Sequence, residues 1–264
     1  MDSDVLTSRL PHIQSALLSA IDAQSFYLCY QGQTELKTQR LVGLEALCRL
    51  PPGESGTITP DHFIPVAEHT GLIAPLERLV LAQVAKDLPL LLEHYPHIRI
   101  SVNLSLRHIT SVDFFSFIHS WLDTLPAESV KRLDFEVTET YFQRITPAVI
   151  QKLGALRERG IRIVMDDFGS GQSSLSRLHT LPFDVVKLDK QFAQQIEHPM
   201  VRAIVKAAVG FMHEFHLELI VEGVETASQA QALQDLGCRV VQGFLYSHPE
   251  PIAHWLKQGR APTP

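Results

Sequence analysis

The chain reads Ile161-Arg162-Ile163-Val164-Met165-Asp166-Asp167, an apolar run that ends in two carboxylates. Six other runs share this pattern, an apolar stretch with a charged or amide side chain at its end or edge: residues 43–45, 101–103, 135–136, 185–187, 220–222 and 240–242. Strand ends that repeatedly offer carboxylate, amide or ammonium groups are typical of a parallel barrel whose rim binds metal and an anionic substrate. The pattern therefore favours a barrel over an open sheet.

Helical and strand patterns alternate along the chain. The expected strands are residues 26–31, 40–49, 98–104, 133–138, 161–166, 184–188, 217–221 and 239–245. The expected helices are residues 10–23, 60–69, 75–94, 112–125, 147–159, 173–179, 200–215 and 227–236. From Asn103 onward, polar strand ends lie about 20 to 35 residues apart, the length of one βα unit.

These elements predict an α/β fold, a modified TIM (β/α)8 barrel formed by one domain over residues 1–264, with a short lead-in at 1–8. A short polar connection joins the first two strands, which is typical of a hairpin. One barrel strand is therefore expected to run antiparallel.

Composition limits the function classes. The chain has 264 residues, of which 45% are hydrophobic and 20% charged, which predicts a soluble globular protein. No apolar run approaches the roughly 18 residues that span a bilayer, and the acidic start lacks the features of a signal peptide. The net charge of −6 argues against a protein that binds nucleic-acid polymers through a basic face. Three distant cysteines predict reduced thiols and a cytoplasmic protein.

Asp166 and Asp167 are candidate metal ligands. Adjacent residues on a strand point to opposite faces, so both can reach one metal cluster only where the strand ends and the chain turns. Gly169 and Gly171 are expected to supply that turn. A turn with an Asp helix cap is the alternative for this pair taken alone.

Glu45, Asn103 and Glu136 lie on three different expected strands. Carboxylate and amide oxygens suit Mg²⁺ or Mn²⁺ rather than zinc. Lys187 ends another strand, where it can hold a nucleophilic water or neutralise charge as a phosphodiester is attacked. Each residue taken singly is more often an exposed strand end, and only their joint placement on successive strands favours a site.

Glu222 and Glu225 lie in a turn after the seventh expected strand, where Gly223 permits a tight turn and Thr226 can cap the next helix. Glu225 is alternatively a favourable acid in the first helical turn. The thirteen histidines form no HExxH motif, and the chain contains no Walker motif, no GxSxG and no complete GxGxxG. A histidine metal site, P-loop hydrolysis and serine-triad chemistry are therefore disfavoured.

Together these residues resemble the EAL-domain family of bacterial cyclic di-GMP phosphodiesterases. The signature Glu45-Ala46-Leu47 follows Tyr30-Gln31, where the family usually has Tyr-Gln-Pro. Further matching segments are residues 60–68, 71–73, 102–105, 135–140, 166–175, 187–189, 221–226 and 242–245. The match covers nearly the whole chain in order and at family spacing, and it is the combined set that is specific.

The resemblance implies a modified TIM barrel whose rim binds two Mg²⁺ or Mn²⁺ ions. By position, the implied metal-binding side chains are Glu45, Asn103, Glu136, Asp166, Asp167 and Glu222, with Gln242 contributing through a water. The implied catalytic residues are Glu45, Asp167, Glu222 and Lys187, the last of which would position and help activate the attacking water.

Other positions are implied to bind the substrate or to support a loop. Gln31, Arg49 and Asp189 are expected to hold the dinucleotide. Glu139, with Glu225, is expected to brace the loop of residues 167–174, which in this family is tied to metal binding and dimerisation.

The implied reaction is hydrolysis of one 3′,5′ bridge of cyclic di-GMP to linear pGpG by a cytoplasmic homodimer. Lowering this second messenger is expected to favour motility over biofilm. The alternatives are a receptor that binds the nucleotide without cleaving it, or a regulatory interaction module of the same fold. A receptor has little need of every metal ligand and Lys187, so the complete set favours the enzyme.

Four positions depart from the family pattern: Gly32, Leu50, Gln172 and His248. Proline commonly stands at the first and tryptophan often at the second, whereas the other two usually carry an aromatic residue and an arginine. None removes a proposed metal ligand, so the departures concern affinity and rate more than the existence of activity.

Overall fold

Eight strands close into a barrel in the computed structural model, which describes residues 3–52, 57–138, 145–170 and 181–258. The strands are β1 (Tyr27–Glu35), β2 (Arg40–Arg49), β3 (Arg99–Asn103), β4 (Leu133–Thr138), β5 (Arg162–Phe168), β6 (Val185–Leu188), β7 (Glu218–Val221) and β8 (Val240–Gln242). Strands β2 to β8 pair in parallel, and β1 pairs antiparallel with both β2 and β8. The expected modified TIM barrel with one antiparallel strand is thereby confirmed.

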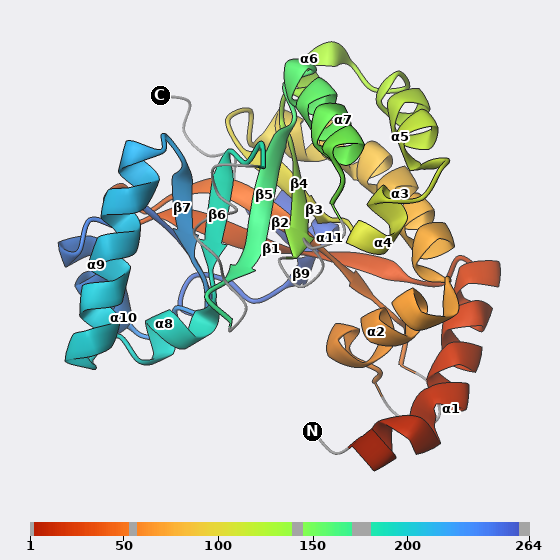
Figure 1. Ribbon diagram of the computed structural model, residues 1–264, viewed down its shortest axis with the longest axis horizontal. Coiled ribbons are helices and arrows are strands. Elements are labelled where there is room, and N and C mark those ends of the chain that lie inside the picture. Colours follow the sequence, from red (N-terminus) through yellow and green to blue (C-terminus); the bar gives the residue numbers. More distant parts are fainter. Residues whose placement is uncertain (1–2, 53–56, 139–144, 171–180, 259–264) are drawn as a thin grey trace.

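Helices surround the strands (Figure 1). They are α1 (Ser3–Asp22), α2 (Pro60–Thr70), α3 (Ile73–His94), α4 (Leu106–Ile109), α5 (Phe114–Leu122), α6 (Ala127–Val130), α7 (Pro147–Glu158), α8 (Lys190–Gln194), α9 (Pro199–Glu214), α10 (Ala227–Asp235) and α11 (Ile252–Lys257). Among the described residues, no helix has the length and apolar character needed to cross a membrane.

Most expected elements are present with shifted ends. The helix expected at 112–125 is shorter in the structure, where α5 covers only Phe114–Leu122. The neighbouring helices α4 and α6 are single turns of four residues each. The short elements α8, α11 and β9 (Glu250–Pro251) were not expected, since runs of two to six residues carry no readable period. The helix expected at 173–179 lies outside the described residues.

The barrel interior is built in layers because every second residue of a strand points to the same side. A small apolar cluster fills the barrel between β5, β6, β7 and β8: Val164, Val185, Ile220 and Val240. Two residues further along the same strands, or just past their ends, stand four polar residues: Asp166, Lys187, Glu222 and Gln242. The apolar layer thus forms the floor beneath a polar rim.

A network of charged groups closes the opposite end of the barrel. Asp134 of β4 is buried, and its two oxygens accept from Arg99 Nε at 2.6 Å and Arg162 Nη2 at 2.5 Å. Arg162 also donates to Glu218 at 2.5 Å, which ties β5 to β7. Burial alone would lower the pKa of Arg162, but Asp134 and Glu218 outweigh it and raise that pKa.

A second core lies between α1, α2 and α3. Its members include Ile13, Leu17, Phe63 and Leu76. Leu50, which stands where the family often has tryptophan, is buried in this core directly after β2. Through this core α2 packs against the end of the barrel, so that α2 lies beside the polar rim.

Gly32 departs from the family proline for a visible steric reason. A Cβ atom at Gly32 would lie 2.9 Å from Leu41 and 3.0 Å from Trp255, since these side chains fill the space beside the strand. The Gly32 N–H donates to Ser247 Oγ at 2.8 Å, a bond that proline cannot make. Trp255 in turn donates to the Tyr30 carbonyl at 3.0 Å, which fixes α11 to β1.

Replacing Asp134 by alanine is expected to lower the free energy of unfolding by about 2–4 kcal/mol, because two arginines lose a buried partner while keeping some contact with water. Urea unfolding followed by circular dichroism measures the change. Asp123→Ala is the matched control, since Asp123 also pairs with an arginine but its side chain is 69% exposed. It should cost less than about 1 kcal/mol. Equal losses for both variants would contradict a structural role for the buried network.

Candidate active site

Lys187 lies at the centre of the polar rim. Its side chain is 1% exposed, and its ammonium lies near carboxylates from four different parts of the sheet. The Nζ distances are 3.0 Å to Glu45, 2.8 Å to Glu136, 3.3 Å to Asp166 and 2.7 Å to Glu222. Burial alone would lower the pKa of Lys187, but these acids raise it well above its usual value, so the group stays charged.

Glu45 of β2 is held as a carboxylate by donors on both oxygens. Asn103 Nδ2 donates to Oε1 at 2.7 Å, and Gln242 Nε2 donates to Oε2 at 2.6 Å. Burial alone would raise the pKa of Glu45, but Lys187 and these two amides outweigh it and hold the pKa below its usual value. The group is therefore ionised and fixed in orientation.

The remaining carboxylates carry more negative charge than one ammonium can balance. Burial, together with the neighbouring acids, raises the pKa of Asp167 to about 6 and that of Glu222 to about 8. The pKa values of Glu136 and Asp166 are also raised, chiefly by burial. A surplus of buried acids of this kind is relieved either by protons or by bound cations.

The donor set fits a divalent cation. Carboxylate oxygens of Asp166, Asp167 and Glu222 lie within 4.8 Å of one another. Oε1 of Glu136 is buried and has no hydrogen-bond partner among the described residues. Oxygen ligands without thiolate or imidazole suit Mg²⁺ or Mn²⁺. The rim therefore contains the groups needed to hold such an ion.

The two adjacent aspartates share a site for a reason other than the expected one. We expected the strand to end at Asp166 and the glycines to turn the chain. Gly169 does turn it, with a left-handed φ of 93°, but only after β5 has continued to Phe168. Pairing shifts between Met165 and Phe168, and Asp167 adopts a left-handed φ of 58°. A bulge of this type re-aims a side chain that would otherwise point outward. Gly171 lies outside the described residues.

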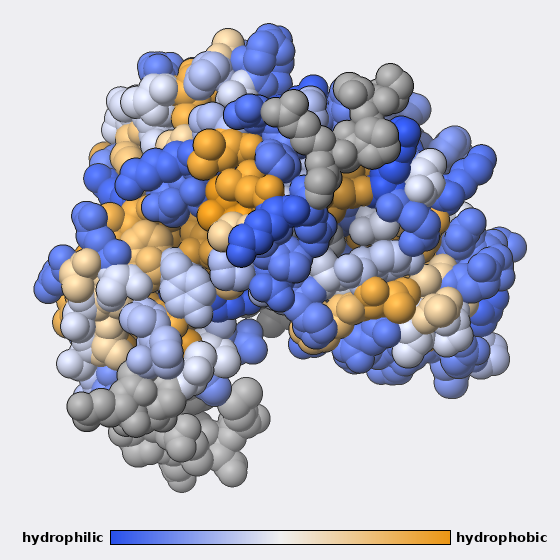
Figure 2. All heavy atoms as spheres, turned by 180° about the vertical axis from the view of Figure 1, so that it is seen from behind, coloured by the Kyte–Doolittle hydropathy of each residue, from blue (hydrophilic) through white to orange (hydrophobic). Residues whose placement is uncertain are grey.

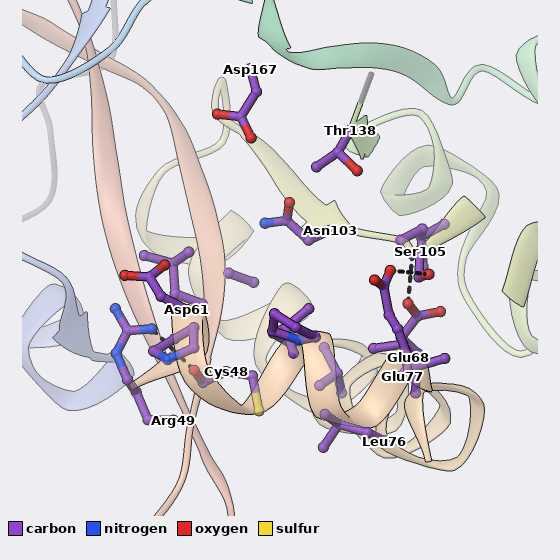
Figure 3. Close-up of a pocket in the computed structure, with 18 residues that line it drawn as sticks. Cys48, Arg49, Asp61, Glu68, Leu76, Glu77, Asn103, Ser105, Thr138 and Asp167 are labelled. Carbon is purple, nitrogen blue, oxygen red and sulfur yellow. Dashed lines mark hydrogen bonds between the residues drawn. The ribbon is translucent and has the colours of Figure 1, made fainter. Parts of the chain in front are cut away.

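A cavity of about 470 Å³ opens beside the rim, with Asn103 and Asp167 facing into it. Arg49 and Asp61 lie on one side, whereas Glu68 and Glu77 meet Ser105 on the other (Figure 3). A second cavity of about 250 Å³ is lined by Gln31, Lys190, Gln194, Glu222, Gly223, Glu225, Gln242, Gly243 and Phe244. The surface is hollowed between the part of the molecule that contains α2 and the part that contains α8 (Figure 2).

The residues expected to bind the dinucleotide occupy different places. Arg49 borders the larger cavity, and its Nη1 donates to the Cys48 carbonyl at 3.0 Å. Gln31 borders the smaller cavity. Asp189 caps α8, because its Oδ1 accepts from the Gln191 N–H at 2.9 Å. One of its two oxygens is therefore already hydrogen-bonded within the protein. The substrate-binding roles stay predictions.

The residues expected to support the loop are only partly described. Glu225 borders the smaller cavity, and its N–H donates to Gln229 Oε1 at 2.8 Å in the capping box of α10. Glu139 and Gln172 lie outside the described residues. His248, where the family usually has arginine, stacks on Phe244 with ring centres 4.4 Å apart.

Sequence reasoning did not identify a buried network next to Asn103. Glu77 of α3 accepts from the Ser105 N–H at 2.6 Å and is hydrogen-bonded to His108 Nδ1 at 2.6 Å, while Ser105 Oγ donates to Glu68 at 2.6 Å. These bonds hold the turn that follows β3. The sequence feature that could have revealed this network is Glu77, an acid on the apolar side of the expected helix at 75–94, where charged residues are unusual.

The model of the EAL domain family matches residues 14–249 of this chain. "Signaling protein YkoW" of Bacillus subtilis (strain 168) is 36% identical over 241 residues, which cover 90% of this chain and 30% of the relative. "Probable cyclic di-GMP phosphodiesterase PdeB" of Escherichia coli (strain K12) is 32% identical over 243 residues, covering 91% of this chain and 46% of the relative. The chain thus spans less than half of either relative.

Solved structures agree with the fold. "PaMucR Phosphodiesterase, c-di-GMP complex" superimposes with a TM-score of 0.84 at 33% identity and covers 92% of this chain and 99% of that one. "Structure of EAL Enzyme Bd1971 - cAMP and cyclic-di-GMP bound form" has a TM-score of 0.88 at 27% identity, covering 95% and 69%. Both structures are described with cyclic di-GMP bound.

Binding of Mn²⁺ is expected to tighten as the pH rises from about 5 to about 8, because Asp167 and Glu222 must lose their protons before they can bind a cation. Below these pKa values the groups are neutral and compete poorly for metal. Titration calorimetry at several pH values measures the affinity. Glu222→Gln is expected to weaken binding and to flatten the upper part of the profile. An affinity of the wild-type protein that is independent of pH would contradict the raised pKa values.

Proposed function

The chain belongs to the EAL domain family, and we propose that it hydrolyses one 3′,5′-phosphodiester bond of cyclic di-GMP to give linear pGpG. The observation that carries the proposal is the buried Lys187 within a ring of acids, at a rim bordered by two cavities. The named E. coli relative and the MucR structure support the substrate.

Two Mg²⁺ or Mn²⁺ ions are part of this proposal. The residues that would hold them are Glu45, Asn103, Glu136, Asp166, Asp167 and Glu222. Bound cations would offset the phosphate charge and lower the pKa of a coordinated water. Asn103 offers its nitrogen to Glu45, so its oxygen is the atom that would serve a cation.

Lys187 would hold the attacking water and neutralise charge rather than remove a proton. A charged ammonium has three donors and no acceptor, and the raised pKa keeps it in that form. Asp167 and Glu222, whose pKa values without metal are about 6 and about 8, would be deprotonated on binding the cations, so neither is assigned as a proton donor. Glu45, whose pKa is lowered, would remain an anion throughout.

The two cavities suit a substrate with two similar halves. The larger borders Asn103 and Asp167, and the smaller borders Glu222 and Gln242, so a ligand that fills both crosses the carboxylate rim. Cyclic di-GMP has two guanines joined by a ring that contains two phosphates. Arg49 would make a forked contact to one phosphate, with Gln31 on the other side.

We favour a hydrolase over a receptor because the described rim holds every proposed metal-binding side chain together with Lys187. A receptor needs the cavities and the cationic contact but not the full set of acids. Such an enzyme would act on the nucleotide pool of the cytoplasm and, by lowering it, favour motility over biofilm.

Purified protein is expected to convert cyclic di-GMP to linear pGpG with Mg²⁺ or Mn²⁺, as read by chromatography. EDTA and Glu45→Ala should abolish product, and Lys187→Met should lower kcat at least about 100-fold, since buried charge near the reacting phosphate is lost. Glu128→Gln, an exposed acid in an ion pair, is the matched control and should keep full activity. Tight nucleotide binding by the wild-type protein without any product would establish the receptor instead.

The homodimer is a separate part of the proposal, and α9 is the surface that we assign to it. Its inner face is buried through Val205 and Met212. A second strip of apolar residues runs along the helix beside this buried face and is exposed: Met200 is 63% exposed, and Ile204 and Phe211 are each 44% exposed. Exposed apolar side chains that line up along one helix typically mark a contact surface.

A second copy of the chain suits this face because of its charge arrangement. Glu214 lies on the same side as Met200, fourteen residues or about four helical turns away, at the carboxyl end of α9. An acid at that end is unfavourable for its own helix dipole. In an antiparallel pair of α9 helices it would lie near the positive amino end of the partner helix.

Light scattering after size-exclusion chromatography is expected to show a dimer for the wild-type protein and a monomer for Phe211→Glu, because the charge would be buried in the interface. Val112→Glu is the control, since Val112 is an apolar residue that is 99% exposed on another surface. A wild-type monomer at tens of micromolar, or dimers that persist with Phe211→Glu, would refute the assignment.

A further inference from the structure

We propose that Gln33 is a positioning residue, which fixes the orientation of Gln242 and, through it, that of Glu45. The proposal rests on the phosphodiesterase function proposed above. Gln33 lies on β1 two residues after Gln31, and is therefore on the same face of the strand. Its side chain is 4% exposed, and its Nε2 donates to Gln242 Oε1 at 3.2 Å.

The direction of the hydrogen bonds is fixed at one end by a backbone carbonyl. The Ser247 carbonyl can only accept, so Gln31 turns its Nε2 toward it, at 3.0 Å. Gln31 Oε1 therefore faces Gln242 and accepts from Gln242 Nε2 at 3.2 Å. Because the direction of the first bond is forced, that of the second is forced as well.

The contact at the other end agrees with this direction. Gln242 Nε2, which already donates to Gln31, also donates to Glu45 Oε2 at 2.6 Å. The amide nitrogen of Gln242 is thus committed to Gln31 and Glu45, which leaves its carbonyl oxygen for Gln33. Without the donor on Gln33 this buried oxygen would lose its partner, and the amide would be free to turn over.

Gln242 consequently presents an NH₂ group, not its oxygen, to the carboxylate rim. This differs from the role implied by the family resemblance, in which Gln242 serves a metal through a water. In this arrangement Gln242 acts by orienting Glu45, and the site depends on Gln33 for that orientation.

Gly43 gives independent support, because it provides the space that Gln33 occupies. Gly43 of β2 pairs directly with Gln33. A Cβ atom at Gly43 would lie 2.3 Å from Gln33 Oε1, closer than atoms can approach. An alanine at this position would therefore displace the Gln33 side chain while leaving its chemistry unchanged.

The first test compares wild type with Gln33→Met, which keeps the size and removes the donor. One lost hydrogen bond of this kind is expected to lower kcat and the Mn²⁺ affinity by about three- to tenfold each. The KM for cyclic di-GMP should change less than about twofold, since Gln33 does not border the cavities. Gln231→Met on α10 is the control for an amide loss at the surface and should change neither quantity.

The second test is a double-mutant cycle. Gly43→Ala is expected to lower the Mn²⁺ affinity about as much as Gln33→Ala in the wild-type background, and to have no further effect when Gln33 is already alanine. The same coupling should appear in urea unfolding with EDTA, where no metal contributes. Additive losses in both measurements would overturn the proposal, because Gly43 and Gln33 would then act independently.

The two proposals fail in different ways. A wild-type protein without turnover refutes the phosphodiesterase function, whereas the Gln33 proposal is then decided by Mn²⁺ binding and by the unfolding cycle. A wild-type enzyme that turns over normally and loses nothing in Gln33→Met refutes the positioning role alone.

Discussion

The structure depends on a buried ammonium group surrounded by acids. Lys187 sits inside the barrel with almost no contact with water, at a cost in solvation that only close and well-placed carboxylates can offset. Its partners Glu45 and Glu136 come from β2 and β4 and Asp166 from β5, so the ion cluster forms only when the barrel is closed. Folding and assembly of the site are therefore coupled, since the ammonium meets these acids together only in the closed barrel.

The same strands that carry the site also secure the barrel. On β4, Asp134 binds Arg99 and Arg162 at one end, while Glu136, two residues on, meets Lys187 at the other. The apolar layer between them keeps the two charged networks apart. Because the strand period is two, both networks share one face of the sheet, and a change in register would disrupt them together.

The surplus of acids at the rim connects this architecture to function. One ammonium does not balance the neighbouring carboxylates, and these acids add to the effect of burial in raising the pKa values of Asp167 and Glu222. Bound cations would bring the positive charge that the rim lacks. Order within the rim comes from amides, because Asn103 and Gln242 donate to opposite oxygens of Glu45 and hold it in one orientation.

The sequence by itself determined the strand order, the antiparallel hairpin and most rim residues, because alternation and strand ends are local features of the chain. Tertiary structure decided the bulge that turns Asp167 inward, which depends on pairing with β6. It also decided the contact between Gln33 and Gln242, which lie 209 positions apart in the chain. The direction of that hydrogen bond depends on acceptors in other parts of the fold, the Ser247 carbonyl and Glu45. No local sequence pattern indicates such a dependence.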